Sequence, residues 1–186
     1  MSDLRTIKTI NSIQNAFMEL LEIKGFAKIK ITDIADKALI NRNTIYLHYE
    51  SKEDIAISLL KKTGNVYDLG ERLIKIFRSN CDPILVREYF QSLVDTMSTN
   101  IELYRLFMTD PNLNGYLNKE VFKMKEKIAT YLKQTSSNQI RLDYIVSGSF
   151  GIISRWIIFA NASKETIIKE LTNITILNLS RLEVNN

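Results

Sequence analysis

Residues that could act as catalysts or metal ligands are few in this chain, and their scarcity limits which classes of protein it can belong to. The 186 residues include one histidine, His48, and one cysteine, Cys81. A nucleophilic triad or a histidine-based metal site needs more such groups, and the sequence has no glycine-rich phosphate loop. Carboxylate pairs such as Glu19 with Glu22 fit solvated helix faces. We therefore expect no enzyme, no cofactor and no metal site.

Residues 41–48 offer a different chemistry, hydrogen bonding to nucleic acid. No acidic residue lies between Lys37 and Tyr49. Phosphates repel carboxylates, whereas guanidinium, amide and hydroxyl groups bond to phosphates or base edges, and an outward-facing leucine can contact a thymine methyl group. The residues expected to read and dock DNA are Arg42, Asn43, Thr44, Tyr46, Leu47 and His48.

Short helices must position these side chains. The sequence predicts one helix capped by Thr32, a break over residues 39–42, and a second helix that Asn41 caps and that runs to about Tyr49. Ser51 and Asp54 predict a capping box at the start of a third helix. Two short capped helices with a tight joint can set a recognition helix into a major groove. Such helices also occur in many other helical proteins, so periodicity alone leaves both interpretations open.

The same stretch resembles the TetR family of bacterial transcriptional regulators over about the first 60 residues. The matching pattern is Phe17, Gly25-Phe26, Ile31-Thr32, Ile34-Ala35, Ala38, Ile40-Asn41-Arg42, Thr44-Ile45-Tyr46, His48-Tyr49 and Ser51-Lys52-Glu53. Two positions depart from the family: Leu39 replaces a usual glycine in the turn, and Tyr49 replaces a common phenylalanine. The left-handed backbone conformation is unfavourable for leucine.

The resemblance implies two domains in an all-α chain. Residues 1–50 would form a three-helix DNA-binding domain of the helix-turn-helix type, and residues 51–186 a helical effector-binding and dimerisation domain. Thr32 and Lys52 are expected to hold phosphates from the helix ends beside them.

Apolar periodicity predicts helices in the rest of the chain, without a strand pattern. The predicted helices span residues 4–24, 52–77 with interruptions at Gly64 and Gly70, a segment from Pro83 with Asp82 as cap, a segment from a Thr99–Glu102 capping box, 117–133, 139–161, and 164–182 with Ser163 as cap.

The middle of the chain is rich in aromatic residues and methionine. Core packing explains most of them, but several can line an apolar pocket for a small-molecule effector, which the resemblance implies. The residues expected at such a pocket are Tyr89, Phe90, Met97, Tyr104, Phe107, Met124 and Tyr131.

The last two predicted helices are apolar around much of their circumference, more than a surface helix of a monomer needs. Small residues over 147–151 allow another helix to approach closely, so a two-fold dimer is expected. Its predicted interface residues are Ile145, Phe150, Ile153, Trp156, Ile167, Leu171 and Ile174.

Three general features of the sequence predict where in the cell the protein is found. The first residues are too polar for a signal peptide, Arg155 interrupts the most apolar stretch, and the single cysteine suits a reducing compartment. We expect a cytoplasmic protein that does not span a membrane.

Together these observations predict a homodimeric transcriptional regulator that binds a near-palindromic double-stranded operator. We expect a repressor that a small-molecule effector releases. The alternative is an adaptor or activator of the same fold that a partner protein controls.

Overall fold

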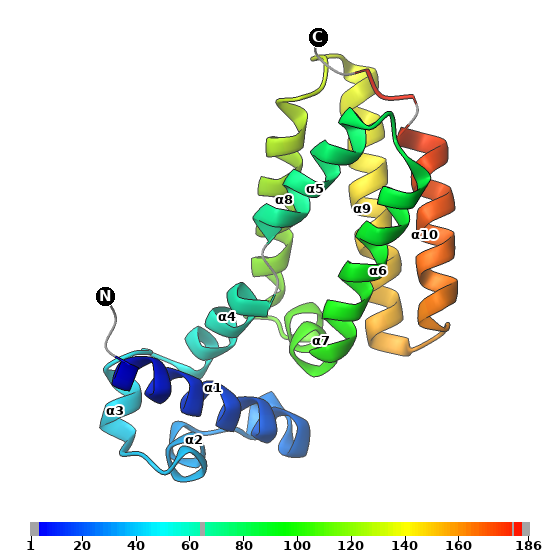
Figure 1. Ribbon diagram of the computed structural model, residues 1–186. Coiled ribbons are helices and arrows are strands. Elements are labelled where there is room, and N and C mark those ends of the chain that lie inside the picture. The colour runs from blue at the N-terminus through cyan, green and yellow to red at the C-terminus, as the bar shows by residue number, and fades with distance from the viewer. Residues whose placement is uncertain (1–3, 64–65, 180, 184–186) are drawn as a thin grey trace. The chain divides into compact units, whose positions relative to one another are not determined.

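The computed structural model describes residues 4–63, 66–179 and 181–183, and among them every regular element is a helix. The expected all-α fold is therefore confirmed (Figure 1). The elements are α1 (Leu4–Lys24), the 3₁₀ turn η1 (Phe26–Lys28), α2 (Ile31–Ala38), α3 (Arg42–Tyr46), α4 (Lys52–Thr63), α5 (Val66–Arg78), α6 (Pro83–Thr99), α7 (Ile101–Thr109), α8 (Asn114–Ala129), α9 (Ser136–Phe159) and α10 (Lys164–Leu179).

The chain forms two compact units, Met1–Gly64 and Asn65–Asn186. The sequence places the functional boundary at residue 50, before α4. In the structure α4 belongs to the first unit because it packs against α1.

The first unit is held together by α1, which packs on both α2 and α4, while α3 packs on α2. Its fully buried side chains come from each of these helices: Ile13, Phe17, Ile34, Ile45 and Ile55. The rings of Phe17 and Phe26 meet edge to face at 6.2 Å, which closes the core beneath η1.

The second unit is a helical bundle. α6 packs on α10, α5 on α8, and α9 on α7, α8 and α10. Figure 1 shows α7 at one end of this bundle. Its core is made of apolar side chains from α5 to α10, among them Ile74, Val86, Phe90, Leu103, Phe107, Leu142, Ile157 and Ile168.

Several helix starts agree with the sequence predictions because side chains satisfy their free N–H groups. α1 spans the predicted residues 4–24. The Ser51 hydroxyl accepts a hydrogen bond from the N–H of Asp54 at 3.1 Å, and the Asp54 carboxylate accepts one from the N–H of Ser51 at 3.0 Å. Asp82 caps α6 by accepting from the N–H of Ile84 at 2.8 Å.

Other predicted boundaries are wrong. α5 runs through Gly70 without a break, while the interruption predicted at Gly64 lies outside the described residues. Thr99 does not start α7, because it is the last residue of α6 and its hydroxyl donates to the carbonyl of Asp95. Helix α8 ends at Ala129 and α10 at Leu179, both earlier than predicted.

Candidate DNA interface

The joint between α2 and α3 depends on Leu39, which adopts the left-handed conformation with φ 56° and ψ 42°. Its N–H donates to the carbonyl of Asp36 at 3.2 Å, and the N–H of Ile40 donates to that of Ala35 at 3.0 Å. This pair of bonds is a Schellman motif, which usually has glycine in the position of Leu39. The turn thus has the geometry that glycine would give, although the leucine side chain is 91% exposed.

The first turn of α2 begins earlier than the sequence suggests. The cap position is Lys30, not Thr32, and the N–H of Lys30 donates to the Asp33 carboxylate at 2.7 Å. Thr32 is the second residue of α2 and is exposed beside the N–H groups of this turn. The Lys24 ammonium, 2.6 Å from Asp33, and the N–H of Lys30 hold the pKa of the Asp33 carboxyl below its usual range.

The start of α3 is fixed by Asn41, whose side chain accepts a hydrogen bond from the N–H of Asn43 at 2.9 Å. Ile45 is fully buried and anchors the helix to the core. α3 ends at Tyr46, but the N–H groups of His48 and Tyr49 both donate to the carbonyl of Ile45 at 2.9 Å. This extra turn explains why the sequence pattern predicts helix to about Tyr49.

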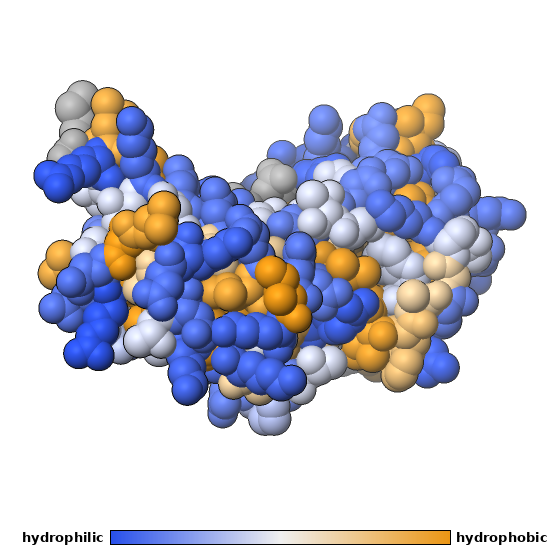
Figure 2. Space-filling view, turned by 90° about the horizontal axis from the view of Figure 1, so that it is seen from below, coloured by the Kyte–Doolittle hydropathy of each residue, from blue (hydrophilic) through white to orange (hydrophobic). Residues whose placement is uncertain are grey.

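The side chains predicted to read DNA lie together on and just after α3. Arg42 and Asn43 are exposed, Tyr46 is 54% and Leu47 80% exposed, while Thr44 and His48 are half-buried. Figure 2, seen from below the view of Figure 1, shows a mostly hydrophilic surface with scattered apolar side chains. α3 and Leu47 just after it thus present guanidinium, amide and phenol groups and one leucine to solvent, a set that suits phosphates and base edges.

The side chain of Lys52 carries a charge and also makes contacts that stabilise the first unit. Its ammonium donates to the carbonyls of Phe26 at 2.8 Å and Ile29 at 3.1 Å, and lies 4.3 Å from the centroid of the Phe26 ring. An ammonium has three protons, and these two carbonyls accept hydrogen bonds from two of them.

Sequence reasoning missed Gln14, which is only 3% exposed on the inner side of α1. A signal was present: Gln14 falls between Ile10 and Phe17 at helical spacing, in the apolar stripe that faces the core. Reading the stripe for its polar member would have found it.

The seven residues predicted for an effector pocket lie in the second unit, and most are core residues. Tyr89, Phe90, Met97, Tyr104 and Phe107 are at most 8% exposed, while Met124 and Tyr131 are half-buried. Tyr89 meets Phe90 edge to face at 5.1 Å, and the Arg72 guanidinium lies 5.6 Å from the Tyr89 ring. Burial raises the pKa of Tyr89 above its usual range.

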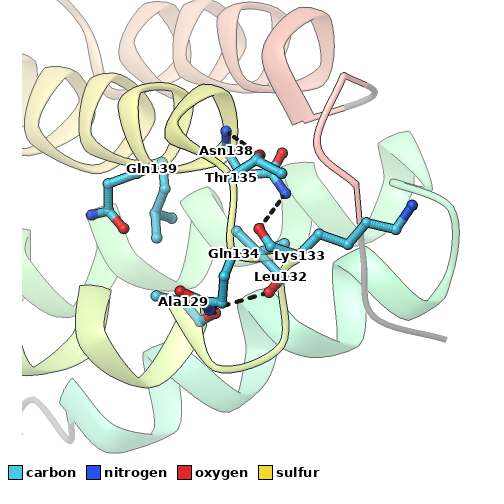
Figure 3. Close-up of a pocket in the computed structure, with 8 residues that line it drawn as sticks. Ala129, Leu132, Lys133, Gln134, Thr135, Asn138 and Gln139 are labelled. Carbon is cyan, nitrogen blue, oxygen red and sulfur yellow. Dashed lines mark hydrogen bonds between the residues drawn. The ribbon is translucent and has the colours of Figure 1, made fainter.

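A hollow between the end of α8 and the start of α9 is lined by none of these seven (Figure 3). Its volume of about 10 Å³ suits at most one water. Asn138, 3% exposed, lines it and donates to the carbonyls of Lys133 at 2.9 Å and Glu183 at 2.8 Å. Its carbonyl oxygen accepts from the N–H of Glu183 at 3.1 Å. This side chain therefore fastens the C-terminal segment to α9.

The residues predicted for a dimer interface are mostly used inside the second unit. Ile145, Ile153, Trp156, Ile167 and Leu171 are at most 7% exposed, so they cannot supply an exposed surface. Phe150 is half-buried, and Ile174 is 37% exposed. The large apolar side chains that α9 and α10 expose are Ile140, Tyr144, Phe159, Ile174 and Leu177, so Ile174 alone of the predicted set belongs to this exposed group.

α9 is long and apolar enough to cross a membrane by length and composition. Core helices of soluble proteins pass the same test, and α9 packs on α7, α8 and α10 with 33% of its apolar stretch buried.

Comparison with known proteins agrees with this geometry. Residues 13–59 match the family model of bacterial regulatory proteins of the tetR family. The uncharacterized HTH-type transcriptional regulator YxbF of Bacillus subtilis (strain 168) is 36% identical over 62 residues, which is 33% of this chain and 16% of that protein's length. The chain thus matches only a small part of this curated relative.

Solved structures extend the similarity to the whole fold. The dihydroxyacetone kinase operon activator DhaS superposes with a TM-score of 0.67 at 19% identity, covering 95% of this chain and 99% of its own. A putative TetR-family regulator from Mesorhizobium loti MAFF303099 gives 0.68 at 16% identity, covering 98% and 100%. Thermus thermophilus FadR, a repressor in complex with lauroyl-CoA, gives 0.57 at 19% identity, covering 95% and 97%. At these identities the likeness shows a shared fold.

Proposed function

Because the chain belongs to the TetR family of bacterial regulatory proteins, we propose that it is a cytoplasmic transcriptional regulator that reads a near-palindromic operator. The observation that carries the proposal is the exposed face of α3. Its polar groups are held by a buried Ile45 and an Asn41 cap, and no carboxylate lies among them.

Each side chain has a role that suits its exposure. Asn43 and Tyr46 point to solvent from α3 and are assigned to base edges, and Leu47 to a thymine methyl group. Arg42, Thr44 and His48 are assigned to docking on α3. Thr32 at the start of α2 and Lys52 at the start of α4 are assigned to phosphates.

A palindromic operator requires two copies of α3 related by two-fold symmetry. We assign the dimer contact to α9 and α10, which expose Ile140, Tyr144, Phe159, Ile174 and Leu177. The two half-sites would then lie about 34–36 Å apart, one helical turn of DNA, or a multiple of it.

Regulation is assigned to the second unit. A ligand there can shift DNA binding only by its differential affinity for two states of the dimer. Thermus thermophilus FadR, a repressor of the same fold, was crystallised with lauroyl-CoA, which supports a repressor released by a small molecule. The expected ligand-contacting residues remain Tyr89, Phe90, Met97, Tyr104, Phe107, Met124 and Tyr131.

A second function, activation under the control of a partner protein, is supported by a different observation. DhaS, which has the same fold over 95% of this chain, is an operon activator. The tight burial of the aromatic residues in the second unit also suits a body that needs no small ligand. Recovery of a bound protein instead of a bound small molecule with the purified dimer would favour this second function.

The test of the proposal is a binding selection of the purified chain against random duplex DNA at physiological salt. A near-palindrome should be recovered, and Tyr46→Ala should weaken binding to it by about tenfold or more while the dimer persists. Lys52→Ala should weaken operator and random DNA alike and lower the salt slope by about one, and its unfolding temperature is measured beside binding because the variant also loses the hydrogen bonds to the carbonyls of Phe26 and Ile29. Binding that is only weak and independent of sequence would refute the proposal.

A further inference from the structure

A buried hydrogen-bond junction joins three segments of the first unit behind α3. The Gln14 side-chain nitrogen on α1 donates to the Tyr49 hydroxyl at 3.2 Å and to the Ser58 hydroxyl on α4 at 3.1 Å. The two hydroxyl groups also lie 3.3 Å apart. Gln14 is 3% and Tyr49 8% exposed, so the bonds form largely out of water. We call Gln14, Tyr49 and Ser58 the Tyr49 junction.

Lys62 fixes the direction of these bonds. Its ammonium donates to the Gln14 side-chain oxygen at 3.1 Å and to the Asn11 side-chain oxygen at 3.0 Å. An ammonium cannot accept a hydrogen bond, so the oxygen of the Gln14 amide must face Lys62. The nitrogen must therefore face Tyr49 and Ser58. A rotation of the amide by 180° would break the hydrogen bonds to Tyr49 and Ser58 as well as the one from Lys62.

Phenylalanine would fill the apolar part of this position equally well, and it would leave the Gln14 nitrogen with one partner fewer. A buried polar group that loses a hydrogen-bond partner destabilises the fold, so the buried Gln14 amide favours a tyrosine over a phenylalanine at position 49. Tyr49 follows directly on the last turn of α3, where its N–H donates to the carbonyl of Ile45. Its side chain thus connects the end of the reader helix to α1 and α4.

We infer that the Tyr49 junction sets the orientation of α3 against α4, and that Tyr49 is a positioning residue for reading DNA sequence. This inference rests on the proposed function of α3. α4 is the last helix of the first unit in chain order, so a change that reaches this unit along the chain meets Ser58 before it meets α3. The junction makes sequence reading dependent on the position of α4.

The test compares Tyr49→Phe, Ser58→Ala and the double variant with the wild-type chain. Binding is measured to the selected operator and to a random duplex over a range of salt. Tyr49→Phe removes one oxygen and no charge, so random-duplex affinity and the salt slope should stay unchanged. Operator affinity should fall about three- to tenfold, as expected for one hydrogen bond. The double variant should lose less than the product of the two single losses.

Ile13→Val is the matched control for a merely structural role. It removes one methylene from a fully buried residue of the same unit and leaves every bond of the junction in place. Operator-over-random preference should stay at the wild-type level in this variant. An equal loss of preference in Ile13→Val and Tyr49→Phe would overturn the inference, and so would unchanged preference in Tyr49→Phe.

Amide hydrogen exchange separates this inference from the proposed function. If the wild-type chain shows no sequence preference, the proposed function fails, and the junction is then decided by exchange alone. Tyr49→Phe should speed exchange of the His48 and Tyr49 amides more than exchange of the amides in α2. Equal acceleration in both places would overturn the junction, whatever the DNA experiments show.

Discussion

Replacing Leu39 with glycine should stabilise the first unit, although the change removes a large side chain. Leu39 sits at φ 56°, where the Cβ of an L-residue crowds the following carbonyl. Glycine has no Cβ and adopts this conformation freely. The two hydrogen bonds of the turn are made by backbone atoms, so the substitution leaves them intact.

The expected gain is the difference of three contributions. Relief of the left-handed leucine is worth about 1–2 kcal/mol. The greater freedom of glycine in the unfolded chain opposes it by about 0.5–1 kcal/mol. The side chain is 91% exposed, so the lost burial costs about 0.2 kcal/mol, roughly a tenth of that of a fully buried leucine. The free energy of unfolding should rise by about 0.5 kcal/mol.

The assay is amide hydrogen exchange of the slowest amides of α1 in the full chain, which report the opening of this unit. Leu39→Gly should slow them about twofold. Leu39→Ala is the control, because alanine keeps the Cβ and the strain and should bring no gain. Faster exchange in the glycine variant, or an equal gain with alanine, would refute the argument from backbone strain.

Three further changes have expected outcomes elsewhere in the chain. Asn138→Ala removes three hydrogen bonds of a buried side chain and should lower the free energy of unfolding of the second unit by about 2–4 kcal/mol, measured by urea titration with tryptophan fluorescence. The Asp33 carboxyl should titrate below its ordinary pKa of 3.8 by NMR and move towards it in Lys24→Gln. Because its folded-state pKa is lowered, Asp33 stabilises the fold fully above the unfolded value, and this contribution disappears as the pH falls through the folded pKa. Leu177→Lys places a charge on an exposed apolar residue of α10 and should shift sedimentation from dimer to monomer while the helical circular dichroism stays unchanged, and the unfolding temperature should no longer depend on protein concentration.

The sequence predicted helices well where local side chains satisfy the helix ends. The cap formed by Asp82 and the box of Ser51 with Asp54 are encoded within a few residues, and both were found. The prediction that Thr32 caps α2 is wrong, because the Asp33 carboxylate accepts a hydrogen bond from the N–H of Lys30 and the helix therefore begins closer to the N-terminus, with Lys30 as its cap. Several side chains near a helix start can accept hydrogen bonds from its free N–H groups, and the sequence alone does not determine which of them does so.

Most of the surface proposed for the dimer contact could not be predicted from the sequence, for a different reason. Periodicity shows that α9 and α10 are apolar on more than one side, but it cannot say which side the protein's own helices cover. Trp156 has the composition of an interface anchor, yet it is 6% exposed and its indole N–H donates to the carbonyl of Ala162 at 3.0 Å. It therefore closes the connection between α9 and α10 within the unit.

The two departures from the family pattern bracket α3, and the structure gives them opposite effects. Leu39, before α3, adds strain to a turn whose geometry is unchanged. Tyr49, after α3, adds hydrogen bonds that reach α1 and α4. The two side chains share no hydrogen-bond partner in the described part of the chain, so their effects on stability should add. Their effects on DNA should not be alike: Leu39→Gly should leave operator preference intact, while Tyr49→Phe should reduce it. A chain carrying both changes should then have a free energy of unfolding close to that of the wild type but a weaker preference for operator over random DNA. This result would separate the stability of the first unit from the orientation of α3.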